Sequence, residues 1–378
     1  MMKICGITAE YNPFHKGHAY HLAEAKRQSG ADALIVVMSG HFVQRGEPAV
    51  FNPYERARDA LMAGADAVFM MPPEASTSSA EGFAEYSTGL MDKLGCDAVS
   101  CGVEPEMNRD RIIESGEMLA EETEEFGRQI RNLMKTGISY PLAAAKTLGT
   151  EQLGPNALLA AEYVKAMKRN KINMEFVPVV RTGSAYNDTE IHPDEYPSAT
   201  ALRKALLEEN ADGTLRCEAE RASSGFCRPL GPDDFLPEII NSIRRSKDLE
   251  QYLDCDAAIA SRLRKSEFRY RTYEEMVKDI KTREYTYTRI SRAIIHIFLE
   301  ICERKVKADS AHLIGFRNTE VLSELKRRAA VPIISKAADY KEALESSARA
   351  ADLYNQVYWK KYAVELPGFF RQNILQIR

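Results

Sequence analysis

The chain has 378 residues, of which 44% are hydrophobic and 28% are charged, and its net charge is −4 at pH 7. This length permits two domains with a sizeable core, and the composition excludes a disordered protein. No apolar run approaches membrane-spanning length, so we expect a soluble, cytoplasmic protein without a membrane partner. The seven scattered cysteines lack the second pair or the clustered histidines of a zinc site, so we expect free buried thiols and no metal bound by protein side chains.

The first hundred residues alternate between strand-like and helix-like segments. Asn52 and Pro53 are typical of a helix N-cap followed by the first helical residue. Strands that alternate with helices predict an α/β fold with a Rossmann-like, doubly wound parallel sheet, whose ligands bind at the carboxyl ends of the strands. Apolar runs predict strands at 4–9, 33–38, 67–71 and 98–101, and amphipathic segments predict helices at 17–28, 54–62 and 81–94.

The rest of the chain has mainly helical periodicity. A stretch rich in Gly, Ser and Pro at 217–234 separates a predicted α/β domain over residues 1–216 from a mainly helical domain over 235–378. Before that stretch we expect helical segments at 109–136, 156–170 and 197–207 and a strand at 175–180. After it we expect helices at 236–245, 257–264, 272–282, 288–302, 320–329 and 340–362, with a possible strand at 331–334.

The segment His15-Lys16-Gly17-His18 lies where the first predicted strand gives way to the first helix. A helix N-terminus offers free N–H groups to phosphates, and Gly17 lets the phosphates approach the backbone closely. His15 and His18 could then donate hydrogen bonds to an α-phosphate as charge develops there. His-x-Gly-His at this place resembles the nucleotide-binding motif of the adenylyl-transferring HIGH superfamily. The alternative is a pair of ordinary surface histidines, which a bare four-residue pattern does not exclude.

Three positions at predicted element boundaries fit a nucleotide site. Gly102 follows the fourth strand, where a residue without a side chain could underlie the nucleotide. Asn156 could contact ribose or adenine, or could serve only as a helix N-cap. Arg181 leaves the fifth strand at its carboxyl end, where charged residues are often functional.

The helix predicted to begin near Ser198 carries two hydroxyls and an arginine in its first turns. Ser198, Thr200 and Arg203 could therefore form a second phosphate cradle. The alternative for Ser198 is ordinary capping of the helix.

Positive charge is concentrated in one segment of the helical half. Residues 261–310 contain 13 Lys and Arg against 8 Asp and Glu, which gives 13 − 8 = +5. Mixed basic and aromatic surface suits an RNA backbone with exposed bases, although a solvated helical face would have the same charge. The interleaved aromatic residues are Phe268, Tyr270, Tyr273, Tyr285 and Tyr287.

Five segments together resemble the bacterial tRNA(Met) cytidine acetate ligase family: 10–18, 39–48, 198–206, 281–290 and 313–316. The resemblance implies that ATP, with Mg²⁺ bound through its phosphates, activates acetate to acetyl-adenylate. The acetyl group then passes to N4 of the wobble cytidine of elongator tRNA(Met). The chain departs from the family pattern at Lys16, at His41 and over 182–188, so a paralogue that activates an acyl group for another RNA acceptor is an alternative.

The resemblance and the motif positions assign roles to individual residues. Catalysis would fall to His15, His18 and Arg203. Gln44 and Arg45 would shape the acyl pocket or the tRNA end of the site, and tRNA would dock on Arg283, Arg289 and Arg292. The ATP-binding set would be Ile7, Thr8, Ala9, Glu10, Tyr11, Asn12, Pro13, Phe14, His15, Lys16, Gly17, His18, Ala19, Tyr20, His21, Gly102, Asn156, Arg181, Ser198, Thr200 and Arg203.

Two other classes of function remain open from the sequence. One is a nucleotidyltransferase that transfers AMP to a small phosphate acceptor. The other is a non-catalytic RNA-binding protein on a decayed enzyme frame, against which the intact histidine pair argues. The sequence does not predict the oligomeric state.

Overall fold

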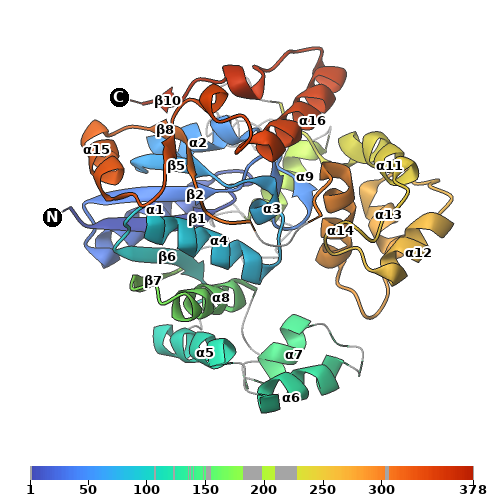
Figure 1. Ribbon diagram of the computed structural model, residues 1–378, viewed down its shortest axis with the longest axis horizontal. Coiled ribbons are helices and arrows are strands. Elements are labelled where there is room, and N and C mark those ends of the chain that lie inside the picture. The colour runs from blue at the N-terminus through green and yellow to red at the C-terminus, as the bar shows by residue number, and fades with distance from the viewer. Residues whose placement is uncertain are drawn as a thin grey trace.

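The computed structural model describes residues 2–105, 108–121, 124–134, 136, 138, 140–147, 149, 155–181, 198–208, 228–302 and 306–377. Its centre is a sheet with the strand order β10-β8-β5-β2-β1-β6-β7, and β9 pairs with β8 (Figure 1). Five strands are parallel to one another: β1 (Ile4–Ala9), β2 (Ala33–Met38), β5 (Ala67–Met70), β6 (Ala98–Val103) and β7 (Glu175–Val180).

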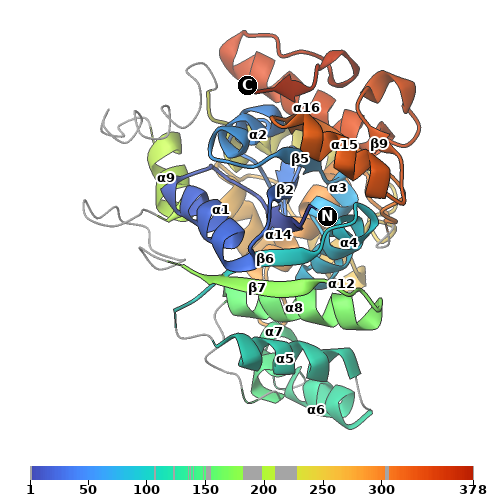
Figure 2. The ribbon, with the colours of Figure 1, turned by 90° about the vertical axis from the view of Figure 1, so that its left-hand side faces the viewer.

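Helices cover both faces of this sheet because the central strands are apolar on both sides. In β2, Leu34 and Val36 pack with α1 (Lys16–Ser29) and α2 (Pro53–Met62). The alternate residues Ile35 and Val37 pack with α4 (Ala80–Lys93) and α8 (Pro155–Arg169). Figure 2 shows α8 along one face of the sheet, with α5 and α6 beyond it. The predicted doubly wound α/β architecture is confirmed.

The segment over 235–378, expected to be mainly helical, also contributes strands to the sheet. After the helices, β8 (Ala311–Phe316) returns to the sheet antiparallel to β5, and β9 (Ile333–Ile334) and β10 (Leu375–Gln376) run parallel to β8. β8 is almost wholly buried, so its sequence lacks the alternation that marks a half-exposed strand. The two halves of the chain therefore share one sheet, and the division at 217–234 stays a prediction.

The other elements complete the layers. The region 109–136, expected as one helical stretch, forms α5 (Arg109–Glu121) and α6 (Glu124–Met134). A hairpin of β3 (Phe42–Val43) and β4 (Glu47–Pro48) follows β2 and was not predicted. The remaining helices are α3 (Pro73–Ser76), α7 (Tyr140–Thr147), α9 (Ala199–Leu207), α11 (Leu236–Arg245), α12 (Ala257–Lys265), α13 (Tyr273–Ile280), α14 (Tyr287–Leu299), α15 (Thr319–Arg328) and α16 (Glu345–Tyr362), with 3₁₀ turns at Pro232–Phe235, Ala337–Asp339 and Phe369–Arg371.

Helices α11 to α14 form a helical unit beside the sheet (Figure 1). Its own apolar core includes Phe235, Met276 and Ile294, and Phe42 from the β3–β4 hairpin inserts into the same core. We call the parallel strands and the helices that cover them the α/β body. The hairpin lies within the sequence of the α/β body, but it packs in the core of the helical unit.

Two smaller expectations can also be compared with the structure. Cys5, Cys96, Cys101 and Cys255 are buried free thiols, whereas Cys302 is exposed, and Cys217 and Cys227 lie outside the described residues. Within the described ranges, no helix is both long enough and apolar enough to cross a membrane.

Candidate functional site

A cavity of about 220 Å³ lies at the carboxyl edge of the sheet, where β1, β6 and β7 end. The predicted residues that line it are Thr8, Ala9, Glu10, Tyr11, Asn12, His15, Gly17, His18, Tyr20, His21, Gln44, Arg45, Gly102, Asn156, Arg181, Thr200 and Arg203. The lining does not include Ile7, Pro13, Phe14, Lys16, Ala19 or Ser198. It adds residues that the sequence did not single out: Phe83, Cys101, Leu159, Tyr163, Val179, Val180 and Ala199.

The two histidines of the motif cap helix α1, and the backbone N–H groups that they accept fix the tautomer of each ring. His15 is the N-cap, and its Nδ1 accepts the Gly17 backbone N–H at 3.1 Å. Nδ1 of His18 accepts the His15 backbone N–H at 3.3 Å, which completes a capping box. Because Nδ1 is an acceptor in both rings, the neutral tautomer of each carries its proton on Nε2. The rings stack with centroids 3.8 Å apart, and neither Nε2–H has a hydrogen-bond partner among the residues that the structure describes, so each could donate to a ligand.

These imidazoles stay neutral. Burial, together with the nearby charges of Arg181 and Arg203, lowers the pKa of His15 to about 3. Burial and the neighbouring His15 and His21 hold the pKa of His18 well below its usual range, and burial lowers the pKa of His21 to about 4. The positive charge of the cavity therefore comes from arginines, and the histidines act as neutral hydrogen-bond donors.

Arg203 joins the start of α9 to the loop after β1. Its Nη1 donates to the Asn12 carbonyl at 2.8 Å, and its Nη2 donates to Oγ1 of Thr200 at 3.1 Å. Ser198 is the N-cap of α9, and its Oγ accepts the Ala201 backbone N–H at 3.0 Å. Capping is thus the role that the structure gives Ser198, while Thr200 and Arg203 line the cavity.

Gly102 and Asn156 also line the cavity. A Cβ on Gly102 would come within 3.4 Å of Cγ of Arg181, so glycine leaves room for that side chain over the strand end. Asn156 is not the N-cap of α8 but its second residue, and the carboxylate of Glu104 accepts the backbone N–H groups of Asn156 (3.0 Å) and Ala157 (2.9 Å). Nδ2 of Asn156 also donates to Glu104 at 2.9 Å, which leaves its amide oxygen as the group suited to a nucleotide.

The β3–β4 hairpin connects the cavity to the helical unit. The Gln44 backbone N–H donates to Oε1 of Glu10 at 2.8 Å. Two residues on, the Gly46 carbonyl accepts hydrogen bonds from the hydroxyls of Tyr273 (3.1 Å) and Ser291 (2.7 Å). Gln44 and Arg45 line the cavity between these two anchors, so the fit of the helical unit fixes their position.

A buried arginine that the sequence analysis missed supports the base of the same hairpin. The Arg56 side chain is fully buried in α2 and donates to the carbonyls of Phe51 (3.0 Å), Glu10 and Gly40. An arginine on the apolar side of a short helix is the signal that could have identified it, because a buried charge requires hydrogen-bond partners.

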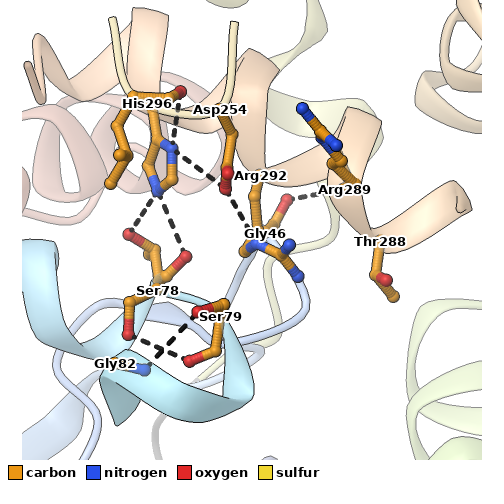
Figure 3. Close-up of polar contacts among 12 residues, drawn as sticks. Gly46, Ser78, Ser79, Gly82, Asp254, Thr288, Arg289, Arg292 and His296 are labelled. Carbon is orange, nitrogen blue, oxygen red and sulfur yellow. Dashed lines mark hydrogen bonds and ion pairs between the residues drawn. The ribbon is translucent and has the colours of Figure 1, made fainter. Parts of the chain in front are cut away.

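The three arginines expected to dock RNA have different surroundings. Arg283 is exposed. Arg289, with 37% of its side chain exposed, pairs with Asp256 at 3.1 Å and stacks over Tyr285 at 4.7 Å. The Arg292 side chain is only 11% exposed and pairs with Asp254 at 3.1 Å (Figure 3). The ion pair of Arg292 thus joins two segments of the helical unit. Arg283 and Arg289 are the more accessible of the three arginines.

Asp254 also lies beside His296 in this cluster (Figure 3). Nδ1 of His296 lies 2.9 Å from the Leu253 carbonyl, and Nε2 lies 3.1 Å from the Thr77 carbonyl. This fully buried imidazole therefore bridges the helical unit and the α/β body.

His41, where the chain departs from the family pattern, does not line the nucleotide cavity. It is buried, its ring lies 5.2 Å from the Tyr354 ring, and it lines a separate cavity with Tyr54 and Phe369. The other departure, at 182–188, lies outside the described residues.

Comparison with known proteins agrees with this geometry. Residues 2–366 match the family model described as HIGH Nucleotidyl Transferase. The tRNA(Met) cytidine acetate ligase of Caldanaerobacter subterraneus subsp. tengcongensis is 32% identical, and the alignment covers 98% of each chain. The chain belongs to the tRNA(Met) cytidine acetate ligase family. The Bacillus subtilis member is 31% identical over 94% of this chain and 92% of its own.

Solved structures with the same fold extend the family comparison. Thermotoga maritima TmcAL in its apo form superposes with a TM-score of 0.83 at 24% identity, and the match covers 100% of both chains. A second crystal structure of that protein, bound to alpha-thio ATP, gives a TM-score of 0.82 at 23% identity, again over 100% of both chains. At these identities the superpositions establish a fold shared by the family along the full chain.

Proposed function

We propose that this protein is an ATP-dependent ligase that converts acetate to acetyl-adenylate and then acetylates N4 of the wobble cytidine of elongator tRNA(Met). The observation that carries the proposal is the pair of neutral Nε2–H donors fixed by the α1 capping box, beside Arg181 and Arg203. Its relatives bear the name of this activity, and a protein of the same fold binds an ATP analogue. ATP and tRNA as substrates place the reaction in the cytoplasm.

In the first step, a carboxylate oxygen of acetate attacks the α-phosphorus of ATP, and pyrophosphate leaves. His15 and His18 donate to the α-phosphate oxygens, on which negative charge grows in the transition state. Neutral donors suit this task because they add no fixed charge that would hold the product phosphate. Arg181, Arg203 and the Thr200 hydroxyl would hold the leaving pyrophosphate.

Mg²⁺ would enter the site on the phosphates of ATP and neutralise part of their charge. Within the described residues, no group of three or more His, Cys, Asp and Glu could hold a metal ion by itself. This donor set fits an ion whose main ligands are phosphate oxygens and water.

The helical unit would bind the tRNA. Arg283 and Arg289 lie on its accessible surface, with Tyr285 beside Arg289, which suits a phosphate backbone and an unstacked base. The β3–β4 hairpin would present Gln44 and Arg45 where the cytidine meets the adenylate. Arg292 is a weaker candidate for RNA contact because its side chain is mostly buried as well as paired with Asp254.

Exchange of labelled pyrophosphate into ATP, measured with and without acetate, tests the first step. The informative variant is His18→Asn, because Oδ1 of asparagine can replace Nδ1 as the acceptor of the capping box while the Nε2–H donor is lost. We expect acetate-dependent exchange to fall by roughly a hundredfold to a thousandfold with the fold intact, as for loss of one oxyanion donor.

Wild-type exchange that requires a phosphate-bearing acceptor instead of acetate would indicate the nucleotidyltransferase alternative. Normal exchange by a well-folded His18→Asn protein would remove the histidine from the chemistry. His18→Ala loses both the capping acceptor and the Nε2–H donor. The difference in thermal unfolding between His18→Ala and His18→Asn therefore measures how much the cap contributes to stability.

A further inference from the structure

The nucleotide cavity contains one feature that binding of ATP and acetate does not explain. The ionisable lining within the described residues comprises three arginines, three histidines, a cysteine, tyrosines and a single carboxylate, Glu10. A carboxylate repels the triphosphate and the acetate that the cavity would hold. Its presence therefore points to a different ligand group, one that donates hydrogen bonds.

The structure holds this carboxylate rigidly. Glu10 follows β1 directly, and Arg56 donates to its carbonyl. Its Oε1 accepts the Gln44 backbone N–H at 2.8 Å. No hydrogen bond or ion pair involves Oε2 among the residues that the structure describes, so one oxygen is anchored and the other is available to a ligand.

The position of Glu10 matches the side from which RNA would approach. Its anchor, Gln44, lies two residues before Gly46, whose carbonyl accepts hydrogen bonds from Tyr273 and Ser291 of the helical unit. The histidine pair belongs to the same loop, at the start of α1. A base presented by the helical unit would thus approach the adenylate site along the hairpin that anchors Glu10.

We infer that Glu10 is the base for the second step of the proposed reaction, in which it receives the exocyclic amino group of the cytidine. Carboxylates recognise the N4 amino group of cytosine by accepting its hydrogen bond. The inference rests on the proposed function and assigns the residue that separates cytidine from uridine, which has no such donor.

The chemistry of the step requires a base. The N4 lone pair is delocalised into the ring, so the amine is a weak nucleophile unless a proton is removed as the bond forms. N4 attacks the carbonyl carbon of acetyl-adenylate, and the bond from that carbon to the phosphate oxygen breaks. AMP leaves with the electron pair, and the N4 proton passes to Glu10 and then to solvent.

Glu10→Gln tests the assignment with little change of shape. The glutamine Oε1 can still accept the Gln44 N–H, but the side chain cannot take a proton. Acetyl-adenylate supplied directly with tRNA isolates the second step, and acetate-dependent pyrophosphate exchange reports the first. We expect transfer to fall by about a hundredfold or more and to fall much further than exchange, so that acetyl-adenylate accumulates when ATP and acetate are supplied.

The pH dependence of transfer gives a second readout. Its acidic limb should be present in the wild type and absent from Glu10→Gln. Glu274→Gln is the control, because Glu274 is an exposed carboxylate of α13 that pairs with Lys278 and does not line the cavity.

The other outcomes overturn the inference in distinguishable ways. Equal loss of exchange and transfer, rescued by higher Mg²⁺, would make Glu10 a metal ligand of the adenylation step. Unchanged transfer in a folded variant would exclude it as the base. An absence of acetate-dependent exchange in the wild type would contradict the proposed function itself, and the role of Glu10 with it.

Discussion

A single methyl group added at Gly46, by substitution with alanine, would push the β3–β4 hairpin away from the helical unit. Its φ of +78° lies in the left-handed region that favours glycine. A Cβ built there would lie 2.5 Å from the backbone carbon of Ser291 and closer still to the backbone nitrogen of Arg292. Both contacts are to the main chain of α14, so a side-chain rotation cannot relieve them.

The expected cost of Gly46→Ala follows from three contributions. Left-handed backbone for alanine costs about 1 kcal/mol. Displacement of the hairpin lengthens the hydrogen bonds from Tyr273 and Ser291 to the Gly46 carbonyl, and each contributes about 1 kcal/mol. We therefore expect the free energy of unfolding to fall by about 3 kcal/mol, with weaker acetyl transfer because Gln44 and Arg45 move with the hairpin.

Gly30→Ala is the matched control. Gly30 is also left-handed (φ 62°), at the C-cap of α1, but nothing lies within 4 Å of a Cβ there. The free energy of unfolding of Gly30→Ala should fall only by the cost of left-handed backbone for alanine, about 1 kcal/mol. Urea unfolding of both variants beside the wild type measures the difference. If Gly46→Ala lowers the free energy of unfolding no more than Gly30→Ala does, the close contact with α14 is relieved without loss of stability, and the reasoning is refuted.

Three further predictions follow from the contacts described. Arg203→Ala should weaken binding of ATP far more than that of AMP in calorimetric titrations, because we expect the guanidinium to contact the β- and γ-phosphates and not the α-phosphate; equal losses would place it elsewhere. Replacement of Arg283 and Arg289 by Gln should weaken tRNA binding and reduce its salt slope by about one per phosphate contact, with pyrophosphate exchange unchanged and only a small drop in thermal stability from the lost Arg289–Asp256 pair. Arg327→Gln on α15 should change neither the tRNA affinity nor its salt slope. Burial lowers the pKa of His312 to about 4, so the unfolded state takes up a proton near pH 6.5 before the folded state does, and stability is lost as the pH falls from 6.5 towards 4. His312→Phe should therefore gain about 2 kcal/mol at pH 5 relative to its effect at pH 8, and equal denaturation shifts at the two pH values would contradict this.

Local patterns predicted the elements that are stabilised locally. The bounds predicted for β1, β2 and β7 match the structure because each is a short apolar run between turn residues. Asn52 caps α2 through Tyr54 and Glu55, as its place before a proline predicted. β8 was missed because it pairs with β5, more than 240 residues earlier, and nothing in its own sequence distinguishes a buried strand from a buried helical turn.

In the candidate site, too, some residues could be predicted from local sequence patterns and others could not. The residues expected to face the phosphates lie at element boundaries, at the N-termini of α1 and α9 and the ends of β6 and β7, and a sequence pattern can mark such boundaries. The apolar back of the cavity comes from Phe83 in α4 and from Leu159 and Tyr163 in α8. These side chains occupy ordinary core positions of their helices, and only the packing of the sheet brings them into the cavity.

The tertiary contacts also change the relation expected between the two halves of the chain. The sequence suggested that adenylation and RNA binding could be separated because their motifs are far apart. In the structure, a hairpin of the α/β body places Phe42 in the helical core and Gln44 against Glu10. Substitutions on the outer surface of the helical unit, such as those at Arg283 and Arg289, should therefore affect RNA binding alone. A change at Gly46 should reach both activities, because the same seven-residue segment shapes the cavity and carries the contact with α14.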